Sequence, residues 1–334
     1  MTISSDNTSL SNIVAHVSEI KVHYPLQRGW IRKKRFTLKA VDGVGFELRR
    51  GEVLGLVGES GCGKTSLGRA ILRLIEPNSG SLEIDGVDFR KLSGRELRKK
   101  RPLVQMIFQD PYASLDPRMT VYDALEEPLL AHFSFTNALR RQKIESILDL
   151  VGLPFKMCRK YPHEFSGGQR QRIAIARALI LEPKILIADE PVSCLDVSVQ
   201  AQILNLLKQI QHRLGLSMIF ISHNLAVVKY ISDRIAIMYL GKIVEIADCN
   251  DLYQNPQHPY TKALISAVPI PDPSKERARR HAGLSGEPPS PISPPSGCAF
   301  HPRCPIATPR CSREEPRLEP YMKEQWKVSC WEVK

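Results

Sequence analysis

The chain has 334 residues, of which 43% are hydrophobic and 25% are charged. This balance excludes collagen-like, fibrous and disordered chains, and the length leaves room for two domains of about 150 residues each. Lysine and arginine outnumber aspartate and glutamate by 47 to 35, so that the formal net charge is +12. A surplus of this size favours a partner that carries phosphates, such as nucleic acid, a nucleotide or an anionic membrane surface.

Membrane-spanning and secretory signals are missing from the sequence. No apolar run approaches the roughly 18 residues that a membrane-spanning helix needs. The first twelve residues are largely polar, which argues against a signal peptide. We therefore expect a cytosolic chain, in which structural disulfides are rare.

Short apolar runs alternate with segments of helical period from Ile13 to about Ser266. Alternating strands and helices are typical of an α/β fold with a largely parallel sheet. The predicted buried strands are Glu52–Val57, Lys184–Ala188, Ser217–Ile221 and Arg234–Tyr239.

A glycine-rich loop follows the first of these strands. Residues 58–65 read G-E-S-G-C-G-K-T, a complete G-x-x-x-x-G-K-[ST] motif, and a helix-like stretch, Ser66–Leu74, comes next. Glycines let the backbone N–H groups face phosphate oxygens, while Lys64 supplies charge to the β and γ phosphates and Thr65 reaches Mg²⁺. The sequence therefore predicts a nucleoside triphosphate site. The residues assigned to it are Gly58, Glu59, Ser60, Gly61, Cys62, Gly63, Lys64, Thr65 and Ser66.

Cys62 stands inside this loop, next to a helix N-terminus. Such a position favours a reactive thiolate. The alternative is that the loop buries the thiol and leaves it inert. The sequence leaves both interpretations open.

Helical period dominates the middle of the chain, between Pro111 and Glu182. The pattern indicates a helical subdomain over residues 111–182, inserted into the α/β core. The predicted helices are Val121–Ala131, Asn137–Val151 and Gln169–Leu181, and a further helix, Val197–Leu214, is predicted beyond the subdomain.

A second apolar strand ends in two carboxylates, since residues 185–190 read I-L-I-A-D-E. Asp189 can hold Mg²⁺ through water, and Glu190 can orient or deprotonate the attacking water. An acidic strand end or a helix cap is the simpler alternative for such a hexamer alone. Its position 125 residues after Lys64 in the same α/β core favours the catalytic role.

Residues 165–169 read F-S-G-G-Q and open a helical stretch. The N–H groups and the helix dipole form a second anion site there, although S-G-G alone indicates only a flexible turn. Together with the glycine-rich loop and I-L-I-A-D-E, this string resembles the ATP-binding cassette family, in particular the ATPase subunits of ABC transporters. The residues assigned to the second site are Ser166, Gly167, Gly168 and Gln169.

The resemblance implies roles for three further residues. Tyr24, in K-V-H-Y, is placed like the aromatic residue that stacks on adenine, with a tyrosine on a strand face as the alternative. Gln109, in I-F-Q-D-P, is similar to the Q-loop glutamine that touches Mg²⁺ and the attacking water, and His223, in I-S-H-N-L, to the switch histidine at the γ-phosphate. The implied catalytic residues are Glu190, His223, Gln109 and Lys64, and the implied Mg²⁺ ligands are Thr65, Gln109 and Asp189.

The composition changes after Val268, because 13 of the 25 prolines lie between Pro269 and Pro320. Proline fixes φ and removes a backbone donor, so we expect little regular structure there. We interpret Pro269–Pro295 as an extended connector and Gly297–Lys334 as a small module organised by its cysteines. The predicted fold class is thus an α/β P-loop core (1–268) with an inserted helical subdomain and a Cys-rich, proline-rich C-terminal extension (269–334).

The strings N-P-Q-H-P-Y and G-C-A-F-H-P-R-C-P resemble the C-terminal extension of oligopeptide and dipeptide importer ATPases, especially the second of the two ATPases in such systems. The resemblance implies an ATPase that energises peptide import at the cytoplasmic face of the inner membrane. Its implied partners are a paralogous ATPase in a head-to-tail heterodimer, two transmembrane permeases and, indirectly, an extracytoplasmic peptide-binding protein. Nickel, glutathione or an antimicrobial peptide is the alternative cargo.

A second class of function is a cassette ATPase that acts on nucleic acid through a zinc module. Only 56 residues separate Gln109 from Ser166, too few for the coiled coil of the chromosome-maintenance type. The excision-repair type carries two cassettes, whereas this chain has one. We therefore expect no nucleic-acid partner.

Four of the eight cysteines lie in the last 37 residues, which favours a metal site over coincidence. Four thiolates can hold either Zn²⁺ or an iron–sulfur cluster. The spacing C-x₅-C-x₆-C-x₁₈-C lacks the C-x₂-C pairs of most zinc modules. The resemblance to peptide-importer ATPases implies a 4Fe–4S cluster, with zinc as the alternative. The assigned ligands are Cys298, Cys304, Cys311 and Cys330.

Overall fold

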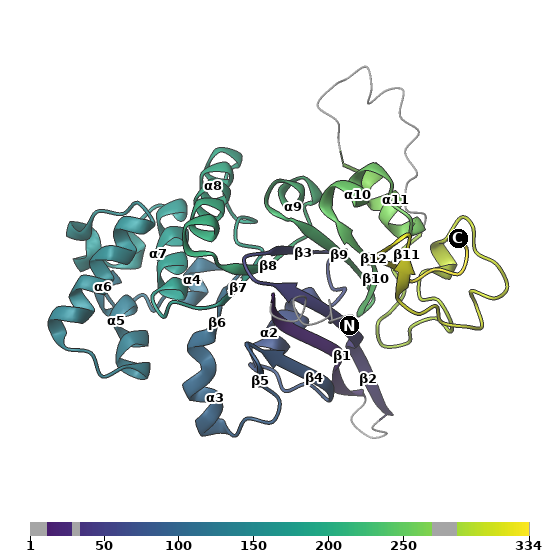
Figure 1. Ribbon diagram of the computed structural model, residues 1–334, viewed down its shortest axis with the longest axis horizontal. Coiled ribbons are helices and arrows are strands. Elements are labelled where there is room, and N and C mark those ends of the chain that lie inside the picture. The colour runs from purple at the N-terminus through teal and green to yellow at the C-terminus, as the bar shows by residue number, and fades with distance from the viewer. Residues whose placement is uncertain (1–11, 29–33, 269–285, 334) are drawn as a thin grey trace, which may run out of the picture. The chain divides into compact units, whose positions relative to one another are not determined.

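The computed structural model describes residues 12–28, 34–268 and 286–333 (Figure 1). These residues divide between two compact units, each of which mixes helices and strands. The first unit takes the described residues of Met1–Ala15, Glu47–Val53 and Glu83–Ile221, and the second takes those of His16–Phe46, Leu54–Leu82 and Ser222–Lys334. In the described part of the chain, no helix is both long and apolar enough to cross a membrane.

Three parallel strands form the core of the first unit, in the order β8 (Ser217–Ser222), β7 (Ile185–Asp189) and β6 (Val104–Ile107). Every residue of β7 and β8 is buried. A parallel strand covered on both faces needs such a continuous apolar sequence. The two strands predicted here are confirmed to within one residue at each end.

Helices make up most of the remainder of the first unit, and Figure 1 shows α5, α6 and α7 grouped together. The predicted helices are confirmed, and α8 has the predicted bounds. The helix at the F-S-G-G-Q string begins at Gly167, two residues earlier than predicted, because Ser166 caps it. The elements are β5 (Val87–Asp88), α3 (Gly94–Lys100), η1 (Arg101–Leu103), α4 (Pro111–Ser114), α5 (Val121–His132), α6 (Asn137–Leu150), η2 (Phe155–Arg159), η3 (Pro162–Glu164), α7 (Gly167–Leu179) and α8 (Val197–Leu214).

Two groups of strands lie mainly in the second unit. One group runs in the order β11, β12, β10, β9, β3, with β3 and β9 parallel and the others antiparallel, and the other runs β2, β1, β4. The elements are β1 (Ile13–Arg28), β2 (Lys34–Arg49), β3 (Val53–Val57), α2 (Lys64–Ile71), β4 (Ser79–Ile84), α9 (Leu225–Ile231), β9 (Arg234–Tyr239), β10 (Lys242–Asp248), α10 (Cys249–Gln254), α11 (Pro259–Ser266), η4 (His301–Arg303), β11 (Glu319–Tyr321) and β12 (Lys323–Val328).

The end of the proline-rich segment is more regular than expected. β12 pairs with β10, with Glu245 opposite Val328, and β11 then pairs with β12. Pro320 is tolerated in β11 because an edge strand has one side without ladder bonds. The prediction of little regular structure between Pro269 and Pro320 is therefore wrong at Glu319 and Pro320, and β12 follows that segment. Residues 269–285 of the expected connector lie outside the described residues.

The buried carboxylate of Glu245 joins three segments of the second unit. It accepts hydrogen bonds from the backbone N–H groups of Gln257 (3.0 Å) and His258 (2.9 Å), and from the indole Nε1 of Trp326 (3.0 Å). Glu245 has 0% exposure. Three donors satisfy a carboxylate that would otherwise be costly to bury. Glu245 thus links β10 to the turn before α11 and to β12.

We expect Glu245→Gln to destabilise the protein by about 1–3 kcal/mol, because the amide replaces one acceptor with a donor that faces N–H groups. Chemical denaturation followed by fluorescence would measure this difference. Glu324→Gln is the matched control, since Glu324 is an exposed glutamate on β12. Equal stability of the two variants would contradict the role of Glu245.

Candidate active site

The glycine-rich loop connects the fully buried strand β3 to helix α2. Gly61 and Gly63 take positive φ angles of 78° and 107°, and Gly63 is the N-cap of α2. The helix begins at Lys64, two residues before the predicted start. The backbone therefore turns within the loop and enters a helix at the lysine, as phosphate binding by loop N–H groups and a helix N-terminus requires.

Lys64 is buried and directed into its own loop. Its Nζ atom donates to the carbonyl oxygens of Gly58 (2.8 Å) and Glu59 (3.0 Å), and it lies 3.6 Å from Cys62 Sγ. Only 6% of Lys64 is exposed. The loop thus holds a positive charge among its own backbone groups, where it can meet a phosphate.

Cys62 is 5% exposed. Burial raises the pKa of its thiol, although the nearby Lys64 ammonium partly opposes this shift. A buried thiol with a raised pKa is protonated and unreactive at neutral pH. Of the two interpretations that the sequence left open, the structure favours the buried, inert thiol.

Gln109 and Glu190 meet at the carboxyl ends of neighbouring strands. β6 and β7 are parallel, with Ile107 opposite Ala188, so the residues that follow them lie at the same edge. The Nε2 atom of Gln109 donates to Oε2 of Glu190 at 3.0 Å. Asp189, the last residue of β7, is 2% exposed. The structure thus places an amide against the carboxylate expected to orient water.

The backbone of Glu190 is strained, with φ at +46°. Its N–H donates to the carbonyl of Ile221 (2.9 Å), and its own carbonyl accepts from Ser193 Oγ (3.1 Å). A non-glycine residue held in this region costs free energy, and such residues concentrate at functional sites. The two hydrogen bonds fix the direction in which the Glu190 side chain leaves the strand.

Ser166 and Gln169 form a reciprocal cap at the start of α7. Ser166 Oγ accepts from the N–H of Gln169 (3.4 Å), and Oε1 of Gln169 accepts from the N–H of Ser166 (3.0 Å). Ser166 is exposed, and Gly167 and Gly168 are half-buried. This end of α7 carries the positive pole of a 13-residue helix and can face an anion.

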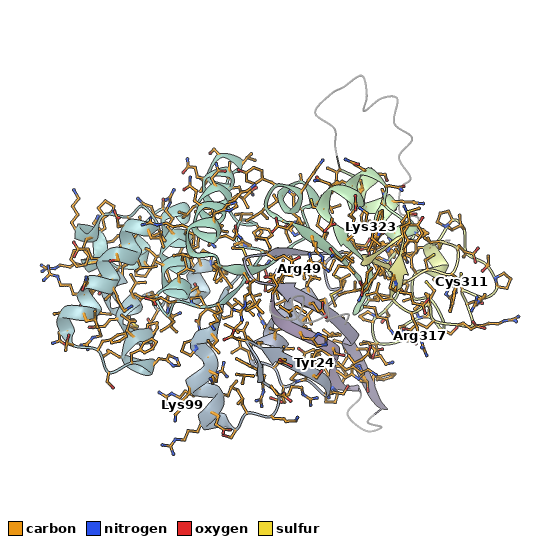
Figure 2. All side chains as sticks on the ribbon, viewed as in Figure 1. Tyr24, Arg49, Lys99, Cys311, Arg317 and Lys323 are labelled. Carbon is orange, nitrogen blue, oxygen red and sulfur yellow. The ribbon has the colours of Figure 1, made fainter. Side chains whose placement is uncertain are left out.

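Two further predicted residues lie on or directly after strands. Tyr24, labelled in Figure 2, is half-buried on β1. His223 is exposed and directly follows the last residue of β8. Gln109, Asp189, Glu190 and 166–169 belong to the first unit, and Tyr24, 58–66 and His223 to the second.

Burial and neighbouring thiols contribute to the raised pKa values of the C-terminal cysteines Cys298, Cys304 and Cys330. Burial, with smaller contributions from the neighbouring thiols of Cys311, Cys330 and Cys304, raises the pKa of Cys298 to about 11. The backbone N–H of Cys298 donates to the carbonyl of Cys311 at 2.8 Å, and Cys311, labelled in Figure 2, is buried. Across residues 12–28, 34–268 and 286–333, no three His, Cys, Asp or Glu side chains are grouped to hold a metal ion. The donors suit a four-thiolate site in kind and number.

Two residues that contact the glycine-rich loop were not predicted. Arg303 binds the side chain of Glu59, and the Tyr260 hydroxyl accepts from its N–H. They lie 244 and 201 residues from Glu59 in the sequence, so no local pattern connects them to the loop. The only signal was their place in the strings G-C-A-F-H-P-R-C-P and N-P-Q-H-P-Y.

The buried strand, glycine-rich loop and helix define a P-loop nucleotide-binding protein. The family described as "ABC transporter" matches residues 41–193, and the family described as "Oligopeptide/dipeptide transporter, C-terminal region" matches residues 244–311. The chain belongs to the ABC transporter family and is therefore an ATPase of that type.

Similar proteins cover almost the whole chain. The oligopeptide transport ATP-binding protein OppF of Salmonella typhimurium is 52% identical over 96% of both chains, and that of Escherichia coli is 51% identical over the same share. Among solved structures, the dimeric post-hydrolysis state of the ATP-binding cassette MJ0796 with ADP and Pi matches with a TM-score of 0.62 and 26% identity. It covers 70% of this chain and 98% of that one.

Proposed function

We propose that this chain is the ATP-hydrolysing subunit that energises import of oligopeptides or dipeptides through an ABC transporter. The observation that carries the proposal is the match of residues 244–311 to the oligopeptide/dipeptide transporter C-terminal region, beyond the part shared by ABC transporters in general. The two OppF relatives, identical at 52% and 51% of positions over 96% of the chain, support the same cargo class.

The P-loop residues 58–66 bind the phosphates in this proposal. Lys64 exchanges its two carbonyl partners for anionic phosphate oxygens, which are stronger acceptors for an ammonium group. Tyr24 stacks on the adenine. When bound, Mg²⁺ neutralises charge on the β and γ phosphates, and its proposed ligands are oxygen donors of the kind it prefers, namely those of Thr65, Gln109 and Asp189.

Glu190 orients and deprotonates the attacking water, and Gln109 holds the carboxylate through its amide. His223 contacts the γ-phosphate. We assign the N–H groups at Ser166–Gln169 to the γ-phosphate bound by a partner subunit, since the family pairs its subunits head to tail. The solved relative with ADP and Pi is described as dimeric.

The partner in this proposal is a paralogous ATPase, and two permease subunits hold the pair at the cytoplasmic face of the inner membrane. An extracytoplasmic peptide-binding protein delivers the cargo. We assign residues 1–268 to the nucleotide-binding domain, with the helical subdomain at 111–182, and residues 269–334 to a Cys-rich, proline-rich extension.

Transport in proteoliposomes tests the proposed function. Vesicles would contain this chain, its paralogous ATPase and two permeases, with the peptide-binding protein outside. We expect uptake of a labelled peptide mixture that requires MgATP and is not reduced by excess nickel or glutathione. Uptake of nickel or glutathione instead would reject the peptide cargo. Retention of the chain on DNA at about 0.2 M salt, without permease binding, would favour the nucleic-acid alternative.

We further propose that Cys298, Cys304, Cys311 and Cys330 hold a 4Fe–4S cluster, with zinc as the alternative. A cluster supplies a cross-link among distant parts of the extension. Burial raises the pKa of the thiols of Cys298, Cys304 and Cys330, so ligation has to displace their protons.

Anaerobically purified wild-type protein is expected to be brown, with about four iron atoms per chain. Cys304→Ser and Cys311→Ser should lose both colour and iron. Cys194→Ser is the matched control, because Cys194 is exposed and lies outside this set. Colourless wild-type protein with one zinc and no iron would show that the cluster assignment is wrong.

A further inference from the structure

Glu59, the second residue of the P-loop, is held by the C-terminal part of the chain. The Arg303 guanidinium makes two parallel hydrogen bonds to its carboxylate, Nη1 to Oε2 at 2.9 Å and Nη2 to Oε1 at 3.1 Å. The Arg303 side chain is 5% exposed and that of Glu59 is 25% exposed. A two-point contact of this kind fixes orientation as well as distance.

An aromatic cluster supports this contact. The Tyr260 hydroxyl accepts from the N–H of Glu59 at 3.0 Å, and Phe300, three residues before Arg303, packs against Tyr260 and Tyr239 at 5.4 and 5.3 Å between ring centres. Tyr260 and Phe300 are at most 1% exposed. A buried cluster in contact on all sides resists rearrangement. Arg303 is thus fixed with respect to the loop that it contacts.

The held residue is also a partner of the catalytic lysine. The carbonyl oxygen of Glu59 accepts from Lys64 Nζ at 3.0 Å and from the N–H of Cys62 at 3.3 Å. Glu59 therefore joins the C-terminal segment, through its side chain and N–H, to the centre of the P-loop, through its carbonyl. A displacement of Arg303 would therefore be transmitted to Lys64 through one residue, Glu59.

We propose that Arg303 is a positioning residue for the P-loop, which links the conformation of residues 298–304 to nucleotide binding through Glu59. The inference rests on the proposed function, because it assigns MgATP as the ligand of the loop. Arg303 directly precedes Cys304, so the backbone that carries a proposed metal ligand also carries the group that holds the P-loop. Each end of this link influences the other, since coupling between two sites is reciprocal.

MgATP affinity measured by calorimetry on the full chain tests the first half of the link. We expect Arg303→Met to weaken binding by roughly five- to thirtyfold. Glu59→Gln should have a similar effect, and the double variant should be no weaker than either single one, because both remove the same contact. Arg303→Lys keeps the charge but not the two-point geometry and should fall between wild type and Arg303→Met.

The matched control is Arg310→Met. Arg310 lies in the same segment and pairs with Glu314 at 2.8 Å, but its side chain is 54% exposed. Its removal should leave MgATP affinity unchanged. Equal affinities of wild type, Arg303→Met and Glu59→Gln would overturn the proposal, as would additive losses in the double variant.

Hydrogen–deuterium exchange of residues 298–304 tests the second half, and a merely structural role would not move this readout. MgATP should slow exchange of this segment in the wild type and in Arg310→Met, but not in Glu59→Gln. Because Glu59→Gln removes the same contact from the other side, the test remains possible even if Arg303→Met does not fold. The same protection in Glu59→Gln as in wild type would overturn the link. Wild-type protein that does not bind MgATP would instead contradict the proposed function itself.

Discussion

Replacing Glu190 with glutamine is expected to slow ATP hydrolysis by roughly 100- to 10,000-fold while MgATP binding is retained. The amide keeps the size of the side chain but cannot accept a proton from water. In the wild type, Nε2 of Gln109 donates to the Glu190 carboxylate at 3.0 Å. In the variant, this Nε2 faces the new amide instead. Single-turnover hydrolysis in the assembled transporter would measure the chemical step, and calorimetry would measure binding.

Glu182→Gln is the matched control for this variant. Glu182 is a second glutamate of the first unit with a positive φ, at 54°, but its side chain is 75% exposed and pairs with Lys143. Hydrolysis by Glu182→Gln should equal that of the wild type. If Glu190→Gln also hydrolysed ATP at the wild-type rate, Glu190 would not be the group that activates water.

Gly63→Ala is expected to weaken MgATP binding by about 100-fold, because displacing Lys64 removes charge-assisted hydrogen bonds to phosphate worth about 3 kcal/mol. A Cβ atom at Gly63 would lie 1.9 Å from the carbonyl oxygen of Ala40, and the residue has a φ of +107°. The backbone must move to relieve this overlap, and Gly63 directly precedes Lys64. Nucleotide titration of the folded variant would measure the loss.

Gly61→Ala separates steric overlap from backbone strain. Gly61 also has a positive φ, +78°, but a Cβ atom there would meet nothing within 4 Å. Strain alone costs about 1–2 kcal/mol, so affinity should fall by no more than about thirtyfold. Equal losses in both variants would show that the close approach to Ala40 is not what makes glycine necessary at position 63.

The elements that the sequence predicted well are those whose signal is local. The apolar run Ile185–Asp189 and the helical face of Val197–Leu214 report burial on one or both sides, and both elements have close to the predicted bounds. The P-loop was predictable for the same reason, since its glycines, lysine and threonine lie within eight residues, 58–65.

Features that depend on distant partners could not be predicted. β12 reads K-E-Q-W-K-V, with only Trp326 and Val328 buried, and what makes it a strand is pairing with β10 about eighty residues earlier. The contact of Arg303 with Glu59 spans 244 residues. The reactivity of Cys62 stayed open at the level of sequence, because its position at a helix start is visible there whereas its burial depends on the tertiary fold.

The pairing of β12 with β10 has a consequence for how the chain is synthesised. β3, β9 and β10 leave the ribosome well before residues 323–328 exist, so β10 presents an unpaired edge to solvent during that interval. Until Trp326 has been synthesised, the carboxylate of Glu245 also lacks the hydrogen bond from its indole. Nascent chains stalled before residue 323 should therefore be prone to edge-to-edge aggregation and should depend on chaperones until β12 emerges.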